Sequence, residues 1–229
     1  MKNFKEKKAI TELVFILDRS GSMAGLEADT IGGYNSLISR QQQEEGECRL
    51  TTVLFDDRCE LLHDRKNLTD VRPITNREYW VRGSTALLDA IGLTIQRIAN
   101  AQRMSAPHRR ADRVLVVITT DGMENASREY DYPRIREMIC LQKEKYGWEF
   151  LFLGANIDAI GTASRFGISA DRAADYHADS EGTQLNYQTL SDAVSCMRAT
   201  GCIDTEWSAP IRQDFSKRGG RQHAGRNHR

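Results

Sequence analysis

Three oxygen-bearing side chains follow a short apolar run near the start of the chain. Residues 13–17 have the apolar, β-branched composition of a buried strand, and Asp18, Ser20 and Ser22 follow at alternate positions. Gly21 lets the backbone curl so that the carboxylate and both hydroxyls can face one point. Hard oxygen donors around one point suit Mg²⁺, which prefers a near-octahedral oxygen shell. The alternative is an ordinary polar turn in which Asp18 or Ser20 caps the next helix.

Two further segments carry donors of the same kind. Thr85 lies in a polar turn ahead of an apolar-periodic helix, and Asp121 comes shortly after a second β-branched run at 113–118. Two ionised aspartates would neutralise a divalent cation, and hydroxyls would complete its shell without adding charge. Together with the first segment, these two segments supply hydroxyls and carboxylates from three separate loops.

In motif order and strand pattern, about residues 10–180 resemble the von Willebrand factor type A (VWA) domain family. The metal-ion-dependent adhesion site (MIDAS) of that family is written Asp-x-Ser-x-Ser, then a Thr, then an Asp. The resemblance therefore implies a divalent metal site whose ligands are Asp18, Ser20, Ser22, Thr85 and Asp121. The resemblance implies Mg²⁺ as cofactor, with Mn²⁺ or Ca²⁺ as alternatives. It also implies a protein partner whose Asp or Glu takes an open position on the metal. The resulting expectation is a non-enzymatic adaptor of the intracellular bacterial type.

Three residues beside the metal motif are candidate ligand contacts. Arg19 lies inside the motif and could pair with a second carboxylate of the partner, although a solvated side chain is the simpler interpretation. Glu124 and Asn125 lie just past Asp121, within reach of a bound ligand.

Strand-like runs alternate with helical ones along most of the chain. This alternation predicts an α/β fold: a doubly wound, Rossmann-like, mostly parallel sheet with helices on both faces and one antiparallel edge strand. In such sheets the loops at the carboxyl ends of the strands build the site. We expect strands at 11–17, 49–55, 59–63, 114–119, 148–153 and 173–178, and helices at 31–43, 85–104, 133–146, 157–166 and 184–197.

The composition of the 229 residues is that of a soluble globular protein, with 40% hydrophobic and 28% charged residues. Lys plus Arg equal Asp plus Glu at 32 each, so net charge favours no class of partner. We divide the chain into a basic extension at 1–9, a VWA-like domain at 10–200 and a basic tail at 201–229, which we expect to be disordered.

The five cysteines are scattered and odd in number, which indicates neither a disulfide framework nor a structural zinc site. The basic N-terminal stretch lacks the apolar region expected of a signal peptide, and no run of about 20 apolar residues could span a membrane. We therefore expect a cytoplasmic monomer without a membrane partner.

Two other functions rank below the protein-binding module. Asp18 could be the nucleophile of a metal-dependent hydrolase or phosphatase, but haloacid-dehalogenase-like phosphatases carry a second Asp two positions on, where this chain has Ser20. No Lys or His lies beside the metal loops to act as a general base. Nucleic-acid contact through the basic tail is the other alternative, and Phe215 is the only aromatic residue between Arg212 and Arg229 to stack on a base.

Overall fold

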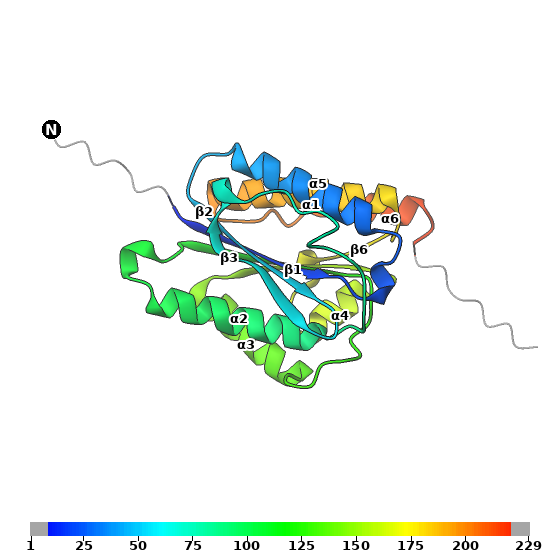
Figure 1. Cartoon of the computed structure of the whole chain (residues 1–229), viewed down its shortest axis with the longest axis horizontal. Coiled ribbons are helices and arrows are strands. Elements are labelled where there is room, and N and C mark those ends of the chain that lie inside the picture. Colours follow the sequence, from blue (N-terminus) through cyan, green and yellow to red (C-terminus); the bar gives the residue numbers. More distant parts are fainter. Residues whose placement is uncertain (1–8, 221–229) are drawn as a thin grey trace, which may run out of the picture.

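A computed structural model describes residues 9–220 of the chain. Within them a single six-stranded sheet has the order β3-β2-β1-β4-β5-β6 (Figure 1). Neighbouring strands are parallel, except that β3 runs antiparallel to β2 at one edge. The predicted α/β class with one antiparallel edge strand is confirmed. The strands are β1 (Thr11–Asp18), β2 (Cys48–Phe55), β3 (Cys59–Asn67), β4 (Arg113–Thr120), β5 (Glu149–Ala155) and β6 (Ala173–Tyr176).

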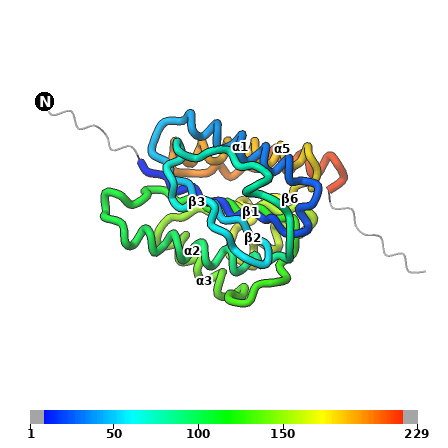
Figure 2. The backbone as a smooth tube through the Cα atoms, viewed as in Figure 1, coloured from blue at the N-terminus to red at the C-terminus, as the bar shows by residue number. Residues whose placement is uncertain are grey.

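Helices cover both faces of the sheet, and β1 contributes alternate side chains to the two resulting cores. Leu13, Phe15 and Leu17 pack on the side of α1 (Glu27–Gln42) and α5 (Ser180–Thr200). Val14 and Ile16 pack on the side of α2 (Leu87–Met104), α3 (Tyr132–Tyr146) and α4 (Ala159–Arg165). Figure 2 shows α1 and α5 side by side on one face, with α2 and α3 on the other. Because β1 is buried on both faces, it appears in the sequence as a continuous apolar run.

The strand order reverses between β1 and β4. From β1 the chain builds β2 and β3 on one side, then returns to place β4 on the other side of β1. The chain after β1 continues into α1 on one face of the sheet and the chain after β4 into α3 on the other, so the two loops diverge at the carboxyl edge of the sheet. This is the position at which open parallel sheets bind their ligands.

The expected boundary at residue 200 is wrong, because the chain continues as part of the same domain. Helix α6 (Ala209–Lys217) packs against β6 and α5. Ile203, Trp207 and Ile211 are buried, and the Trp207 indole N–H donates to the Asp171 carbonyl at 2.8 Å. Ile211 lies in α6, whereas Ile203 and Trp207 lie in the loop and turn ahead of it, and the basic composition of the segment obscures all three. Residues 221–229 of the expected tail, and 1–8 of the expected N-terminal extension, lie outside the described residues.

No helix within residues 9–220 combines the length and apolar character needed to cross a bilayer.

Candidate metal centre

The five predicted metal ligands come together at the carboxyl edge of the sheet. Asp18 ends β1, and the two serines lie in the tight turn that follows it. Thr85 immediately precedes α2, and Asp121 immediately follows β4. The Thr85 hydroxyl donates to Ser20 Oγ at 3.0 Å, and Ser20 Oγ lies 3.0 Å from Ser22 Oγ. Ser22 is exposed, so the hydroxyl cluster opens to solvent on that side.

Gly122 leaves space at the centre of this cluster. A methyl group on its Cα would stand 2.8 Å from Ser22 Oγ, 2.9 Å from Thr85 Oγ1 and 3.6 Å from Ser20 Oγ. The hydroxyls of Ser20, Ser22 and Thr85 therefore converge on one small volume beside the backbone of the Asp121 loop. Any side chain at position 122 would enter it.

The Asp18 carboxylate is buried and held in place by hydrogen bonds to both oxygens. The Ser20 backbone N–H donates to Oδ1 at 2.6 Å, and the Thr120 hydroxyl donates to Oδ2 at 2.5 Å. The Tyr79 hydroxyl donates to the Asp18 carbonyl at 2.6 Å and fixes the end of the strand. Burial raises the pKa of Asp18, and the hydrogen bonds from Thr120 and Ser20 oppose that rise.

The Asp121 carboxylate is equally buried but is not held. Only 3% of the residue is exposed, and neither oxygen has a hydrogen-bond partner of normal geometry. Burial raises its pKa to about 6; the nearby Ser22 hydroxyl lowers that value, and the charge of Asp18 raises it. A buried carboxylate without hydrogen bonds costs free energy unless a cation or a proton neutralises it.

These observations fit a hard divalent cation. The unpartnered carboxylate of Asp121, the fixed carboxylate of Asp18 and three converging hydroxyls form an oxygen-only donor set of the kind that Mg²⁺ and Mn²⁺ prefer. Residues 9–220 contain no group of three or more His, Cys, Asp or Glu residues that could bind a metal. That finding agrees with a site that uses hydroxyls for three of its five protein ligands.

Arg19 is not solvated, contrary to the simpler sequence interpretation, and carboxylates of this chain already pair with it. Its side chain is fully buried, and its Nε donates to Asp56 Oδ2 at 2.8 Å. Nη1 lies 2.8 Å from a carboxylate oxygen of Glu60, and the Trp80 ring covers the guanidinium with its centroid 5.1 Å away. The sequence could not reveal this arrangement because all three partners lie more than 35 positions away.

Asp56 joins Arg19 to the loop that carries Thr85. The same Oδ2 atom accepts a second hydrogen bond from Arg82 Nε at 2.7 Å, and the Asp56 carbonyl accepts from the Ala86 N–H at 2.8 Å. Burial alone would raise the pKa of Asp56, but hydrogen bonds from Arg82, Arg58 and Arg19 hold it below its usual value. Asp56 thus stays ionised and ties the loop at 82–86 to the metal motif.

Glu124 and Asn125 support the Thr85 loop from its other side. Glu124 accepts hydrogen bonds from the backbone N–H groups of Leu88, Ala126 and Ser127, and also from the Ser127 hydroxyl. The Asn125 side-chain oxygen accepts from the Thr85 N–H at 2.9 Å. These oxygens are engaged within the protein, so both residues position the Thr85 loop, and their contact with a ligand stays a prediction.

Sequence reasoning missed four residues that shape the site. Asp56 carried a usable signal, since it is a carboxylate directly after a strand, as Asp18 is. Thr120 and Gly122 flank Asp121, but only the structure shows a hydrogen bond from one and a space left by the other. Tyr79 lies 61 positions from the carbonyl to which it donates, and nothing in its local sequence indicates the contact.

No protein-family model and no curated protein matches this sequence. Solved structures with a similar fold are known. Proximal thread matrix protein 1 from the mussel byssus, with a zinc-occupied MIDAS motif, has 14% identity and a TM-score of 0.56, covering 82% of this chain and 46% of that chain. The manganese-loaded TRAP protein of Plasmodium vivax has 18% identity and a TM-score of 0.53, covering 78% and 72%. A von Willebrand factor type A protein from Catenulispora acidiphila has 12% identity and a TM-score of 0.55, covering 82% and 43%.

These similarities establish the fold, which is that of von Willebrand factor type A domains. The chain spans less than half the length of the mussel and Catenulispora proteins. At such low identity, the metals bound by the mussel and Plasmodium proteins are properties of those proteins.

Proposed function

We propose that this chain is a protein-binding module that depends on a divalent metal. Asp18, Ser20, Ser22, Thr85 and Asp121 would hold the ion, and a carboxylate of a partner protein would take an open position on it. The observation that carries this proposal is the buried, unpartnered carboxylate of Asp121 beside three converging hydroxyls.

The two aspartates have different tasks in this proposal. Asp18 is rigidly positioned by Ser20 and Thr120, so it would fix the place of the ion. Asp121 has no competing hydrogen bond to break, so its full charge is available for coordination. When bound, the ion would supply a Lewis-acidic position for an Asp or Glu of the partner. Mg²⁺ is the proposed ion, because an oxygen-only donor set suits a hard cation.

The module is proposed to act as an adaptor without catalysis, and Ser20 supports this. It stands where haloacid-dehalogenase-like phosphatases carry the second Asp, and its hydroxyl lies within the cluster with Ser22 and Thr85, so it supplies no carboxyl group for acid–base catalysis. A cytoplasmic location remains part of the proposal, and the five free thiols support it.

Nucleic-acid binding through the basic tail receives less support. Arg212 pairs with Glu206 at 2.5 Å, and Arg218 pairs with Asp214 and Asp179 at 2.6 Å each. Two of the six basic residues that motivated the hypothesis are therefore already paired with carboxylates. Arg221, Arg226 and Arg229 lie outside the described residues.

A metal-dependent capture experiment tests the proposed function. The tagged chain is incubated with cell extract in Mg²⁺ or in EDTA, and Asp121→Asn is run beside it as a charge-neutral, nearly isosteric control. Partners should be retained only by the wild-type chain in Mg²⁺. Equal capture in EDTA, or by Asp121→Asn, would contradict a metal-bridged interaction. Mg²⁺-dependent hydrolysis of p-nitrophenyl phosphate would favour the enzyme instead.

A further inference from the structure

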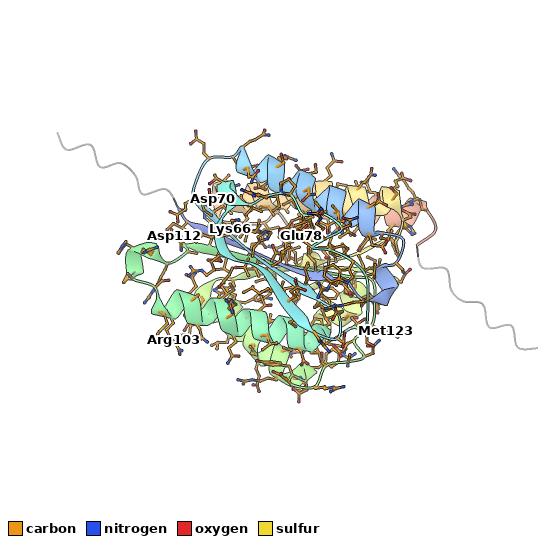
Figure 3. The ribbon with its side chains drawn as sticks, viewed as in Figure 1. Lys66, Asp70, Glu78, Arg103, Asp112 and Met123 are labelled. Atoms are coloured by element: carbon orange, nitrogen blue, oxygen red, sulfur yellow. The ribbon has the colours of Figure 1, made fainter. Side chains whose placement is uncertain are left out.

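A groove of about 400 Å³ lies at the opposite end of the molecule from the metal centre. It is formed by the carboxyl-terminal ends of α2 and α3, the loop at 105–112 and the start of β4, with buried Trp148 and Val114 among its lining residues. Figure 3 labels Arg103 and Asp112 at this end and Met123, two positions after Asp121, at the other. The groove and the metal centre can therefore be occupied at the same time.

The rim of the groove exposes large apolar side chains. Leu141 and Tyr146, on the last turns of α3, are 50% and 57% exposed. Met104 ends α2 next to Arg103 of the groove and is 83% exposed. Together they make this groove a candidate surface for another molecule.

The same rim carries positive charge without a matching carboxylate. Arg103 and Arg110 line the groove, and Arg109 is adjacent in the chain. Within residues 9–220 none of the three forms an ion pair: Arg103 donates to Asn100 Oδ1, and Arg110 donates to backbone carbonyls. By contrast, Arg97, Arg172 and Arg212 elsewhere on the surface pair with acids at 2.5–3.0 Å.

Asp112 is the acidic residue in the lining, and it is already engaged. Its Oδ2 accepts a hydrogen bond from the Ile10 N–H at 2.8 Å, which ties it to the start of β1. The exposed guanidinium groups of Arg103 and Arg110 therefore remain available for a carboxylate from outside the described residues. Two arginines beside an apolar surface suit a ligand with negative charges next to an apolar side chain.

We propose that this groove binds an acidic segment of a partner protein. An apolar side chain of that segment would pack against Leu141, Tyr146 and Trp148, while neighbouring carboxylates pair with Arg103 and Arg110. Residues 1–8 of this chain are a poor candidate, because their four lysines and one glutamate give them the same sign of charge as the groove. With the metal centre at the other end, the module could join two partners.

Fluorescence anisotropy tests the proposal, with EDTA present so that the metal centre does not contribute. The probe is a short fluorescein-labelled peptide of alternating aspartate and leucine. Matched probes replace aspartate with lysine or leucine with alanine, and an oligothymidine of equal length tests for nucleic acid. Saturable binding is expected for the aspartate–leucine peptide, with weaker binding of each altered probe. No saturable binding, or tighter binding of oligothymidine, would overturn the proposal.

Two independent variants connect binding to the groove. Arg103→Glu removes a rim charge and Leu141→Asp removes part of the apolar wall; because both side chains are exposed, neither substitution should disturb the fold. Each should weaken peptide binding about tenfold or more, since a favourable contact becomes a repulsive one. Arg72→Glu is the charge-matched control. Arg72 is exposed, and the nearby Val71 and Ile74 are buried in the core on the α1 and α5 side of the sheet, away from the groove. If all three variants bound like the wild type, the site would lie elsewhere.

Discussion

Asp18 and Asp121 contribute equal charge to the metal centre but have opposite surroundings. Asp18 accepts hydrogen bonds from the Ser20 N–H and the Thr120 hydroxyl, whereas Asp121 accepts none of normal geometry. Replacing Asp18 leaves its buried donors unsatisfied, at a cost of about 1–3 kcal/mol each. Replacing Asp121 by a neutral residue instead removes the free-energy cost of burying an unpartnered charge. Two residues of the same motif should therefore differ in their effect on the metal-free fold.

The expected result is a divergence in thermal stability measured in EDTA. Asp18→Ala should lower Tm, and Asp121→Asn should hold or raise it, when both are followed by circular dichroism. A fall in Tm for Asp121→Asn as large as that for Asp18→Ala would show that Asp121 has partners in the metal-free protein.

The pKa of Asp121 predicts a pH dependence of the metal-free protein. Its folded value of about 6 lies above the ordinary value of 3.8, mainly because of burial. Because the pKa is raised, protonation of the Asp121 carboxyl adds to the free energy of unfolding. This contribution is fully present below pH 3.8 and is lost as pH rises through about 6. In EDTA, the wild type should therefore gain stability relative to Asp121→Asn between pH 7 and pH 5.

Metal affinity should change in the opposite direction over the same interval. The ion competes with the proton for Asp121, so Mg²⁺ affinity should fall as pH drops from 7 to 5. Parallel melting series in EDTA and in Mg²⁺ would measure both effects. A stability difference between wild type and Asp121→Asn that did not change with pH would mean that the carboxylate titrates near its ordinary pKa.

At the scale of elements, the loop at 82–86 is joined to the metal motif by backbone hydrogen bonds, from the Arg82 N–H to the Arg19 carbonyl and from the Gly21 N–H to the Gly83 carbonyl, and by one buried carboxylate. Asp56 at the end of β2 accepts hydrogen bonds from Arg19 in the metal motif and from Arg82 in the Thr85 loop. Asp56→Ala would leave the fully buried Arg19 with only the partly exposed Glu60 as a counter-ion. Loss of one partner of a buried ion pair costs about 3–5 kcal/mol.

Two measurements on Asp56→Ala separate positioning from folding. Urea unfolding should show the loss of stability, and Mg²⁺ titration below the unfolding transition should show weakened affinity, because the side-chain link from Arg19 through Asp56 to Arg82 is lost. Arg58→Ala is the matched control, since its side chain is 80% exposed and pairs only loosely with Asp57 at 3.9 Å. Unchanged Mg²⁺ affinity in Asp56→Ala would restrict Asp56 to a purely structural role.

Helix α6 gives a second prediction at this scale. Ile211 is 1% exposed and packs in the core of the α1 and α5 face. Ile211→Ala should therefore destabilise the protein by about 2–5 kcal/mol, and Gln213→Ala, on the exposed side of the same helix, should change stability little. Equal urea midpoints for the two variants would indicate that α6 does not belong to the folded domain.

For the whole molecule, the sequence was sufficient for the sheet and for the edge at which the predicted ligands lie, but not for what surrounds them. Continuous apolar strands predict a parallel sheet, and a donor directly after a strand must lie at its carboxyl edge. That logic placed Asp18 and Asp121 correctly at this edge. It failed for Arg19, because a charged residue between two metal ligands looks solvated unless Asp56 and Glu60 are known to be near.

The predicted tail failed for a different physical reason. Average composition over residues 201–229 is basic and polar, yet three apolar residues are enough to anchor α6. Long-range contacts of this kind depend on which elements end beside each other, and a single sequence does not encode that locally. The same limit applies to the groove at the far end, whose walls come from segments about 30–40 positions apart.

Isothermal titration of Mg²⁺ into the metal-free protein tests the central claim most directly. The wild type should bind one ion. Asp121→Asn should lose binding, and Gly122→Ala should weaken it because its methyl group enters the volume among the hydroxyls. Gly32→Ala is the control, since a Cβ there meets no atom within 4 Å. Full Mg²⁺ affinity in both Asp121→Asn and Gly122→Ala would contradict the assignment of this metal centre.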